Sequence, residues 1–146
     1  MEAKELMIDD WVVFHDSGYA SDGTVWEKDR VCQIDSIDTY VRVKWYDEDG
    51  CEEEWPNVSV MHLSPIPLTS EILEKNGFVK LWNQYLIKAD KEPFIHLIPL
   101  DNLPNANGRM LVAIKDRYTN AKIAITYVHE LQHALRLCGI EKEIIL

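Results

Sequence analysis

Three side chains near the C-terminus, His129, Glu130 and His133, form the pattern H-E-x-x-H. On a helix, residues four apart stack one turn above each other, so the two imidazoles would share a face and could hold a zinc ion. Glu130 beside them has the chemistry of a general base that activates a zinc-bound water. The pattern therefore raises the hypothesis of a zinc-dependent metallohydrolase or peptidase, with His129 and His133 as metal ligands and Glu130 as the catalytic residue.

The surrounding residues predict a helix from about residue 120 to residue 138, which Asn120 would cap and Gly139 would end. Its apolar residues fall on one broad arc of a helical wheel, and this arc is the predicted core face. They are Ile123, Ala124, Tyr127, Val128, Leu131, Ala134, Leu135 and Cys138. Both histidines fall on the opposite arc together with Lys122, Gln132 and Arg136. We expect that arc to face solvent unless the N-terminal half covers it.

A third zinc ligand is harder to find in the sequence. Metzincin peptidases continue the pattern with glycine and histidine at the positions where this chain has Arg136 and Gly139. Only 13 residues follow His133, which leaves little room for a ligand on a second helix. We therefore favour a solvent-facing helix surface with no metal and no cofactor, and zinc stays the alternative.

Aromatic side chains are dense between residues 26 and 55. They are Trp26, Tyr40, Trp45, Tyr46 and Trp55. Tudor-like barrels use aromatic rings as a cage for methylated lysine or arginine, and the acidic run 47–54 would help to attract such a cation. The alternative is that these rings form core and cross-strand pairs. We favour the core interpretation, with the weaker hypothesis that this half docks a basic peptide or partner protein.

The first half of the chain predicts a small β-barrel of the SH3-like, or Tudor-like, kind. Alternating apolar residues indicate five short strands. They are expected at 5–14, 25–37, 39–48, 51–57 and 59–66, with a loop at 15–24 after the first. Asp49-Gly50 predicts a tight turn between the third and fourth strands.

The proline-rich stretch 64–69 predicts a boundary, which divides the chain into domains 1–66 and 67–146. Thr69 is expected to cap a short helix over 70–76, and Gly77 to follow its end. Strands are expected after it, followed by the helix at 120–138. The strand ranges are 78–88, 92–100 and 109–116, with a last short strand within 141–146. The predicted fold class is α+β, an antiparallel sheet packed on one long helix.

Composition excludes several functional classes. The formal net charge of −10 disfavours nucleic-acid binding and docking on anionic lipid, since both need clustered basic residues. No stretch is long and apolar enough for a membrane helix, and the first ten residues do not resemble a signal peptide. Cys32, Cys51 and Cys138 have no metal-type spacing and suit free thiols. We expect a cytoplasmic protein that does not bind membranes.

Two segments, PIPLTSEILEKNGF at 65–78 and ITYVHELQHALRLCGIEKEI at 125–144, carry a resemblance. They resemble a group of small uncharacterised proteins of gut Bacteroidales bacteria and their phages or prophages. That group has no assigned activity and no established metal site, so the resemblance implies a source and not a mechanism.

The function we predict is a non-enzymatic protein-interaction module of phage or mobile-element origin, whose partner is another protein or a basic peptide. The first alternative is the zinc hydrolase built on His129, Glu130 and His133. The second is an acidic inhibitor of a nucleic-acid enzyme, which would exploit the net charge of −10.

Overall fold

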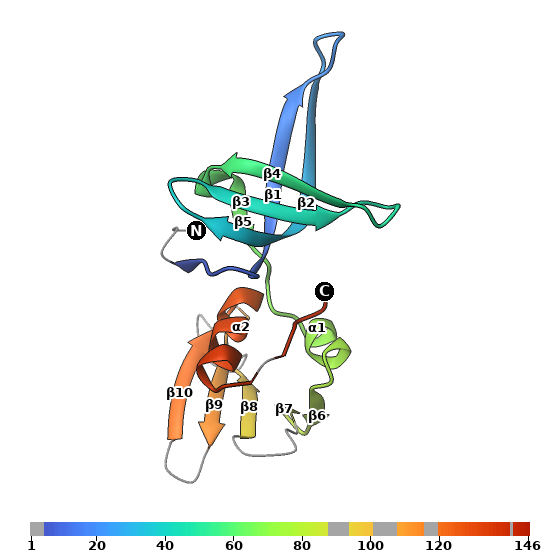
Figure 1. Cartoon of the computed structure of the whole chain (residues 1–146). Coiled ribbons are helices and arrows are strands. Elements are labelled where there is room, and N and C mark those ends of the chain that lie inside the picture. Colours follow the sequence, from blue (N-terminus) through green and yellow to red (C-terminus); the bar gives the residue numbers. More distant parts are fainter. Residues whose placement is uncertain (1–4, 88–93, 101–107, 116–119, 141) are drawn as a thin grey trace. The chain divides into compact units, whose positions relative to one another are not determined.

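The computed structural model describes residues 5–87, 94–100, 108–115, 120–140 and 142–146. The chain divides into two compact units, Met1–Ile66 and Pro67–Leu146. Each contains an antiparallel sheet, and the second adds two α-helices (Figure 1). The fold is therefore mostly β, of the α+β kind. None of the helices in the described ranges is long and apolar enough to span a bilayer.

The N-terminal unit contains a five-stranded sheet in the order β4-β3-β2-β1-β5. Its elements are β1 (Trp11–Tyr19), β2 (Val25–Ile37), β3 (Val41–Tyr46), β4 (Glu52–Val58), the short 3-10 helix η2 (Val60–His62) and β5 (Leu63–Pro65). Five strands form as predicted, but the first begins at Trp11 rather than at residue 5, and the predicted closed barrel is wrong for the described residues. β4 and β5 are the two edges of the sheet. A closed barrel would need these two edge strands to pair, but the three residues of β5 pair only with Val12–Phe14.

Side chains that alternate along these strands form the core of the N-terminal unit. The buried members are Leu6, Val12, Phe14, Cys32, Ile34, Val41, Val43, Val58 and Leu63. Trp45 packs against this cluster and is partly buried. The core interpretation of the aromatic residues thus holds in part for Trp45, whereas Trp26, Tyr40, Tyr46 and Trp55 are exposed.

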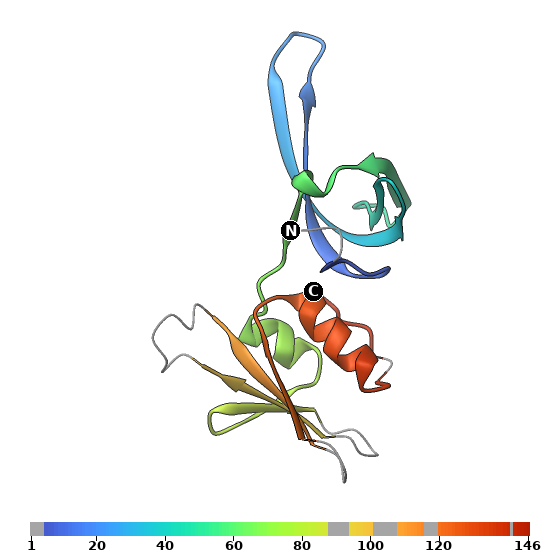
Figure 2. The same cartoon turned by 90° about the vertical axis from the view of Figure 1, so that its left-hand side faces the viewer.

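β1 and β2 extend beyond the rest of the sheet as a two-stranded arm (Figures 1 and 2). The predicted loop at 15–24 is wrong for its first half, because residues 15–19 stay in β1 and pair with residues 25–29 of β2. Gly18 lies opposite Trp26, and a Cβ on Gly18 would stand 2.8 Å from Cζ2 of that indole. The glycine therefore lets the indole lie flat across the neighbouring strand.

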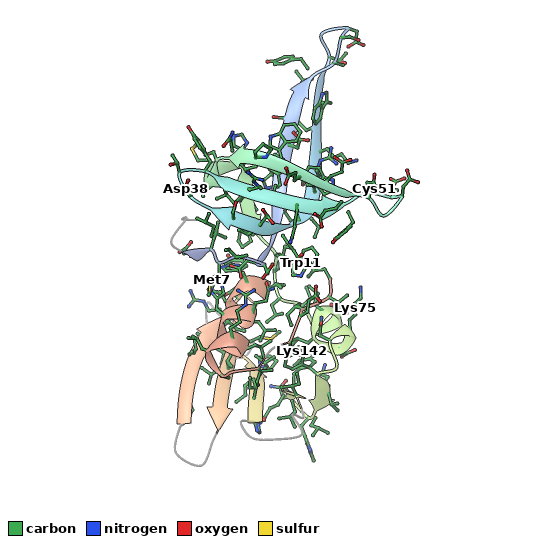
Figure 3. All side chains as sticks on the ribbon, in the orientation of Figure 1. Met7, Trp11, Asp38, Cys51, Lys75 and Lys142 are labelled. Carbon is green, nitrogen blue, oxygen red and sulfur yellow. The ribbon has the colours of Figure 1, made fainter. Side chains whose placement is uncertain are left out.

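The turn between β3 and β4 is where the Asp49-Gly50 pair predicts it. Gly50 has a φ of 78°, a left-handed conformation that glycine adopts without strain. Its N–H donates to the carbonyl of Asp47 at 3.1 Å. Cys51 follows at the end of this hairpin, and Asp38 marks the opposite end of β3 (Figure 3).

The C-terminal unit contains a second five-stranded sheet in the order β10-β9-β8-β7-β6. Its elements are α1 (Ser70–Lys75), β6 (Val79–Leu81), β7 (Gln84–Ile87), β8 (Phe94–Pro99), β9 (Met110–Lys115), β10 (Asn120–Ile125) and α2 (Val128–Leu137). Thr69 caps α1 through its hydroxyl and Gly77 follows with a φ of 76°, as predicted. Both helices lie on the same side of the sheet (Figures 1 and 2).

The long helix predicted for 120–138 is wrong in its first half. Residues Asn120–Ile125 form β10 and pair along their whole length with β9, so no helix begins at Asn120. Ile123 is exposed in the strand, although the helical wheel had placed it in the core. Tertiary pairing with β9 has decided the conformation here, since isolated periodicity over six residues fits either a helix or a strand.

Two smaller strand predictions also change. The single strand expected at 78–88 is two strands, β6 and β7, because Trp82 takes a φ of 57° and turns the chain between them. No strand forms over 142–146, and Glu141 lies outside the described residues. Ile144 is fully buried there, and Ile145 is hydrogen-bonded to the side chain of Asn76, so these contacts rather than strand pairing hold the segment.

Candidate functional site

The H-E-x-x-H residues lie in the first two turns of α2. The ring of His129 stacks on Tyr127, with centroids 5.8 Å apart and planes 9° apart. The rings of His129 and His133 meet edge to face at 5.7 Å. His129 is only 5 % exposed and Gln132 only 4 %, so the expectation that this arc faces solvent is wrong for both. The helix begins at Val128, and the chain that enters it places Tyr127 over the first histidine.

Glu130 has a structural task at the start of α2. Its Oε2 accepts the N–H of Thr126 at 2.6 Å and the N–H of Tyr127 at 3.0 Å. A glutamate at the third helical position that binds the N-cap N–H is one half of a capping box. Its negative charge also favours the positive end of the helix dipole. The carboxylate that would activate water in a zinc hydrolase is therefore already bonded to two backbone amides.

Across the described ranges, no group of three or more histidine, cysteine, aspartate or glutamate side chains is arranged to hold a metal ion. Two histidines outside α2 have other partners: His15 is hydrogen-bonded to Asp29 and Ser64. His96, in β8, lies 3.3 Å from Gln84 through its Nδ1.

The five aromatic residues of the predicted cage lie in separate places. Trp26 covers Gly18 on the arm, and Tyr40 lies over a small hollow at the β2–β3 end with Asp38 and Arg42. Trp45 and Tyr46 line another hollow beside the hairpin tip, where the Tyr46 hydroxyl donates to Glu52 at 2.9 Å. Trp55 lines a third. The structure thus spreads them over the surface rather than around one cavity.

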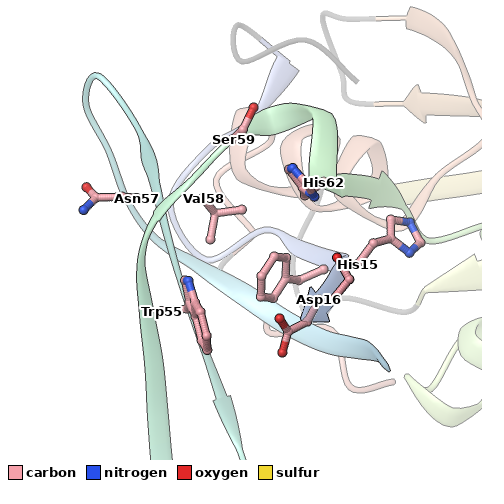
Figure 4. Close-up of a pocket in the computed structure, with 9 residues that line it drawn as sticks. His15, Asp16, Trp55, Asn57, Val58, Ser59 and His62 are labelled. Atoms are coloured by element: carbon pink, nitrogen blue, oxygen red, sulfur yellow. The ribbon is translucent and has the colours of Figure 1, made fainter. Parts of the chain in front are cut away.

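The cavity that contains Trp55 is the best candidate for a binding site. It measures about 230 Å³ and lies between β1 and β4, along the side of the sheet that the missing barrel closure leaves open. β1 contributes residues 14–17, and the other wall is Trp55, residues 57–59 and His62. Figure 4 shows Asp16 and Trp55 pointing into the space between these two strands. The rings of Phe14 and Trp55 are 6.1 Å apart at a tilt of 50°.

Asp16 gives this cavity a buried negative charge. The residue is 5 % exposed, and its Oδ2 lies 3.3 Å from Nε of Arg30. The guanidinium of Arg30 in turn lies over the ring of Trp45, 4.9 Å from the centroid. A carboxylate can accept about four hydrogen bonds, so the bond from Arg30, the one found for Asp16 within the described ranges, leaves capacity for a ligand. The arrangement can bind a second cation next to an aromatic wall.

The negative charge of the chain is concentrated in the N-terminal unit, which contains this cavity. Residues 1–66 carry 16 acidic and 5 basic residues, a formal net charge of −11. Residues 67–146 carry 9 acidic and 10 basic residues, a net charge of +1. The negative field therefore belongs to the N-terminal unit, and it favours the approach of cations over anions.

Phe14 and Asp16 are lining residues of this cavity that the sequence alone did not indicate. The signal was present: the order Val12, Phe14, Asp16 continues one inward-facing row of β1, and a carboxylate in such a row is a buried charge that needs a role. The polar residues after Phe14 predict a loop instead of the second half of a strand, so Asp16 was not expected to lie in this row.

Comparison of the chain with protein-family models, with curated proteins and with solved structures finds no match.

Proposed function

We propose that the N-terminal unit is a non-enzymatic protein-interaction module. The cavity between β1 and β4 would bind a lysine or arginine side chain from a basic segment of the partner protein. One observation carries the proposal: a carboxylate only 5 % exposed, that of Asp16, lines the same cavity as the exposed indole of Trp55. This pairing of an acid with an aromatic wall is the chemistry that recognises an organic cation.

The cavity is large enough for one side chain of a partner but small for a complete small-molecule ligand. Its volume of about 230 Å³ is below the range of roughly 300–1,000 Å³ that small-molecule sites occupy. The methylene stem of a lysine or arginine would pack against Phe14 and Val58, and its charged end would reach Asp16. Trp55 would add a cation–π term of about 0.5–2 kcal/mol.

The experiment is a titration of the full chain with short blocked tripeptides that carry lysine, trimethyllysine, arginine or norleucine at the centre. Nuclear magnetic resonance would follow the indole N–H of Trp55 and the backbone amides of residues 14–17. We expect shifts confined to the cavity with the three cationic peptides and none with norleucine. Trp55→Leu should weaken binding at least threefold, because it removes the cation–π wall of an exposed residue and leaves the core intact.

Asp16→Asn is the sharper variant, and Asp49→Asn is its matched control. Both remove one negative charge from the N-terminal unit, but Asp49 lies in the β3–β4 turn and does not line the cavity. The proposal predicts that only Asp16→Asn abolishes binding. Equal losses in both variants, or shifts spread over the acidic surface, would show non-specific attraction and contradict it.

The zinc hydrolase is the alternative, and it makes a different prediction. Two observations weigh against it: Glu130 Oε2 is held by two backbone amides, and α2 begins only one residue before His129. The test is the zinc content of protein prepared without chelators. Stoichiometric zinc that His129→Ala abolishes would support the hydrolase; substoichiometric zinc, unchanged in that variant, would reject it.

The segments 65–78 and 125–144, with their resemblance to proteins of gut Bacteroidales and their phages, support a mobile-element context for this module. A basic partner is also compatible with inhibition of a nucleic-acid enzyme, since such enzymes display lysine and arginine on their binding surfaces. Capture of the partner through the Asp16 cavity would distinguish this route from simple competition by the acidic surface.

A further inference from the structure

Three polar side chains on neighbouring strands of the N-terminal sheet form a continuous hydrogen-bonded chain. Nδ1 of His15 lies 2.6 Å from Oδ1 of Asp29, and Nε2 of His15 lies 2.7 Å from Oγ of Ser64. The sheet sets these positions. His15 of β1 is the direct cross-strand partner of Asp29 of β2, and Ser64 of β5 pairs with Val13, which shares the face of His15.

The order acid, imidazole, hydroxyl has a chemical meaning. A carboxylate at Nδ1 favours the tautomer with the proton on Nδ1, which leaves Nε2 as an acceptor for the hydroxyl proton. A base within hydrogen-bond reach of a hydroxyl, itself oriented by a third group, is the recognised arrangement of an activated nucleophile. We infer that Ser64 is a nucleophile, with His15 as its general base and Asp29 as the positioning residue, and that its substrates are carboxylic esters.

The reaction balances without any cofactor. Oγ of Ser64 attacks the ester carbonyl as its proton passes to Nε2 of His15, and a carbon–oxygen bond to Ser64 forms. The bond to the alcohol oxygen then breaks, and the alcohol leaves with the proton from His15. Water attacks the acyl group with His15 again as base, so the carboxylic acid is released and Ser64 is restored. The net change is ester plus water to acid plus alcohol.

Exposure sets the relative contributions of His15 and Asp29 to the reaction rate. The side chain of Asp29 is 71 % exposed and that of His15 is 44 % exposed. Water therefore competes for the Asp29 carboxylate, so its orienting effect is weaker than that of a buried acid. Loss of the general base should cost about 10²-fold in the rate of acylation, the lower end of the usual range, and loss of the acid should cost less.

The test uses a fluorophosphonate, which reacts with activated serines: the bond from phosphorus to fluorine breaks, fluoride leaves, and a bond from Oγ to phosphorus forms. Peptide mass spectrometry of the full-length protein would locate and time the modification. We expect Ser64 to be modified, His15→Ala to slow the reaction about 100-fold, and Asp29→Asn to slow it less. Ser70→Ala is the matched control, because the Ser70 hydroxyl accepts from the Tyr85 hydroxyl at 2.7 Å and lies in the C-terminal unit.

Two further measurements separate catalysis from structure. Added imidazole should restore part of the reactivity of His15→Ala, which it would not do if His15 only held the strands together. Ser64→Ala should lose ester hydrolysis yet still bind the lysine tripeptide, so failure here and failure of the proposed binding function are distinguishable. Modification of Ser64 no faster than that of Ser59 or Ser36 in the folded protein would overturn the inference.

Discussion

The carboxylate of Glu130 accepts the backbone N–H of Tyr127, the residue that precedes α2, at 3.0 Å. This contact makes the glutamate of the H-E-x-x-H pattern a helix cap. A glutamate at this position fits both the zinc-peptidase pattern and a helix cap, because a capping box also has glutamate or glutamine at the third helical position. The pattern thus has a full structural explanation at Glu130.

The first prediction concerns that cap. Glu130→Ala should lower the stability of α2 by about 1 kcal/mol, because the N–H groups of Thr126 and Tyr127 lose their acceptor. Glu130→Gln should cost less, since its amide oxygen can still accept but the charge at the helix N-terminus is gone. Hydrogen exchange of the α2 amides would measure both. An unchanged exchange rate in Glu130→Ala would show that the cap contributes nothing.

Some elements were predictable because local chemistry decides them. β2 has the predicted bounds, and the Asp49-Gly50 turn and the Thr69 cap are confirmed. Each of these elements depends on residues close together in the sequence. β2 depends on a run of alternating residues, the turn on a glycine at positive φ, and the cap on a hydroxyl near the N–H that it accepts. The closed barrel failed for the opposite reason. Whether the two edge strands β4 and β5 meet depends on how far the whole sheet curls, and no local pattern encodes that.

The second prediction concerns Asn76, a buried amide that ties the end of α1 to the last residues of the chain. Its Nδ2 donates to the carbonyls of Ile72 and Ile145 at 2.8 and 2.7 Å, and its Oδ1 accepts the N–H of Ile145 at 2.8 Å. Asn76→Ala should therefore cost about 2 kcal/mol, because it leaves these backbone groups without partners. Urea unfolding would give the free energy, and hydrogen exchange at Ile145 would localise it.

Asn83→Ala is the control for that experiment. Asn83 is exposed between β6 and β7, so its replacement should change the free energy of unfolding by less than about 0.5 kcal/mol. Asn76→Asp should be nearly as harmful as Asn76→Ala, because a carboxylate would face the carbonyl of Ile145 instead of donating to it. Equal stability of all three variants would mean that the C-terminal segment is held by the packing of Ile144 alone.

The third prediction tests the arm. Gly18→Ala should destabilise the N-terminal unit by about 1–3 kcal/mol, because its Cβ would stand 2.8 Å from Cζ2 of Trp26. In a Trp26→Ala background the same change should cost almost nothing, so a double-mutant cycle measures the coupling. Tryptophan fluorescence during urea unfolding is the readout. An equal cost in both backgrounds would place the penalty in the strand backbone rather than in the clash.

The candidate site was less predictable than the fold elements. Trp55 was identified from composition, but Asp16 was not, since its role depends on β1 continuing beyond Phe14 to pair with the arm of β2. Likewise, Asp29 and Ser64 become neighbours of His15 only through the β2-β1-β5 order. Both sites are products of strand register, and residues 15, 29 and 64 have no spacing that a one-dimensional pattern would reveal.

The fourth prediction concerns the thiols. Burial raises the pKa of Cys32 to about 12, and it also raises the pKa of the partly buried Cys138. At pH 8 only about one Cys32 thiol in ten thousand is ionised, so iodoacetamide should leave it unmodified in the folded protein. Cys51, exposed at the end of the β3–β4 hairpin (Figure 3), should react first and Cys138 more slowly. Mass spectrometry of tryptic peptides over time would give the order, and early modification of Cys32 would contradict its burial.

The same burial makes a fifth, pH-dependent prediction. An unfolded Cys32 thiol ionises near its ordinary pKa of 9.0, whereas the folded one keeps its proton until about pH 12. Between these values the folded state binds more protons than the unfolded state, so the free energy of unfolding falls as pH rises, by about 1.4 kcal/mol per unit for this group. Below pH 9.0 the contribution is constant. The difference in free energy of unfolding between the native chain and Cys32→Ala isolates the term, because other groups that titrate in this range are common to both. A difference that stays flat from pH 8.5 to about 10.5 would mean that the thiol gains access to water without unfolding.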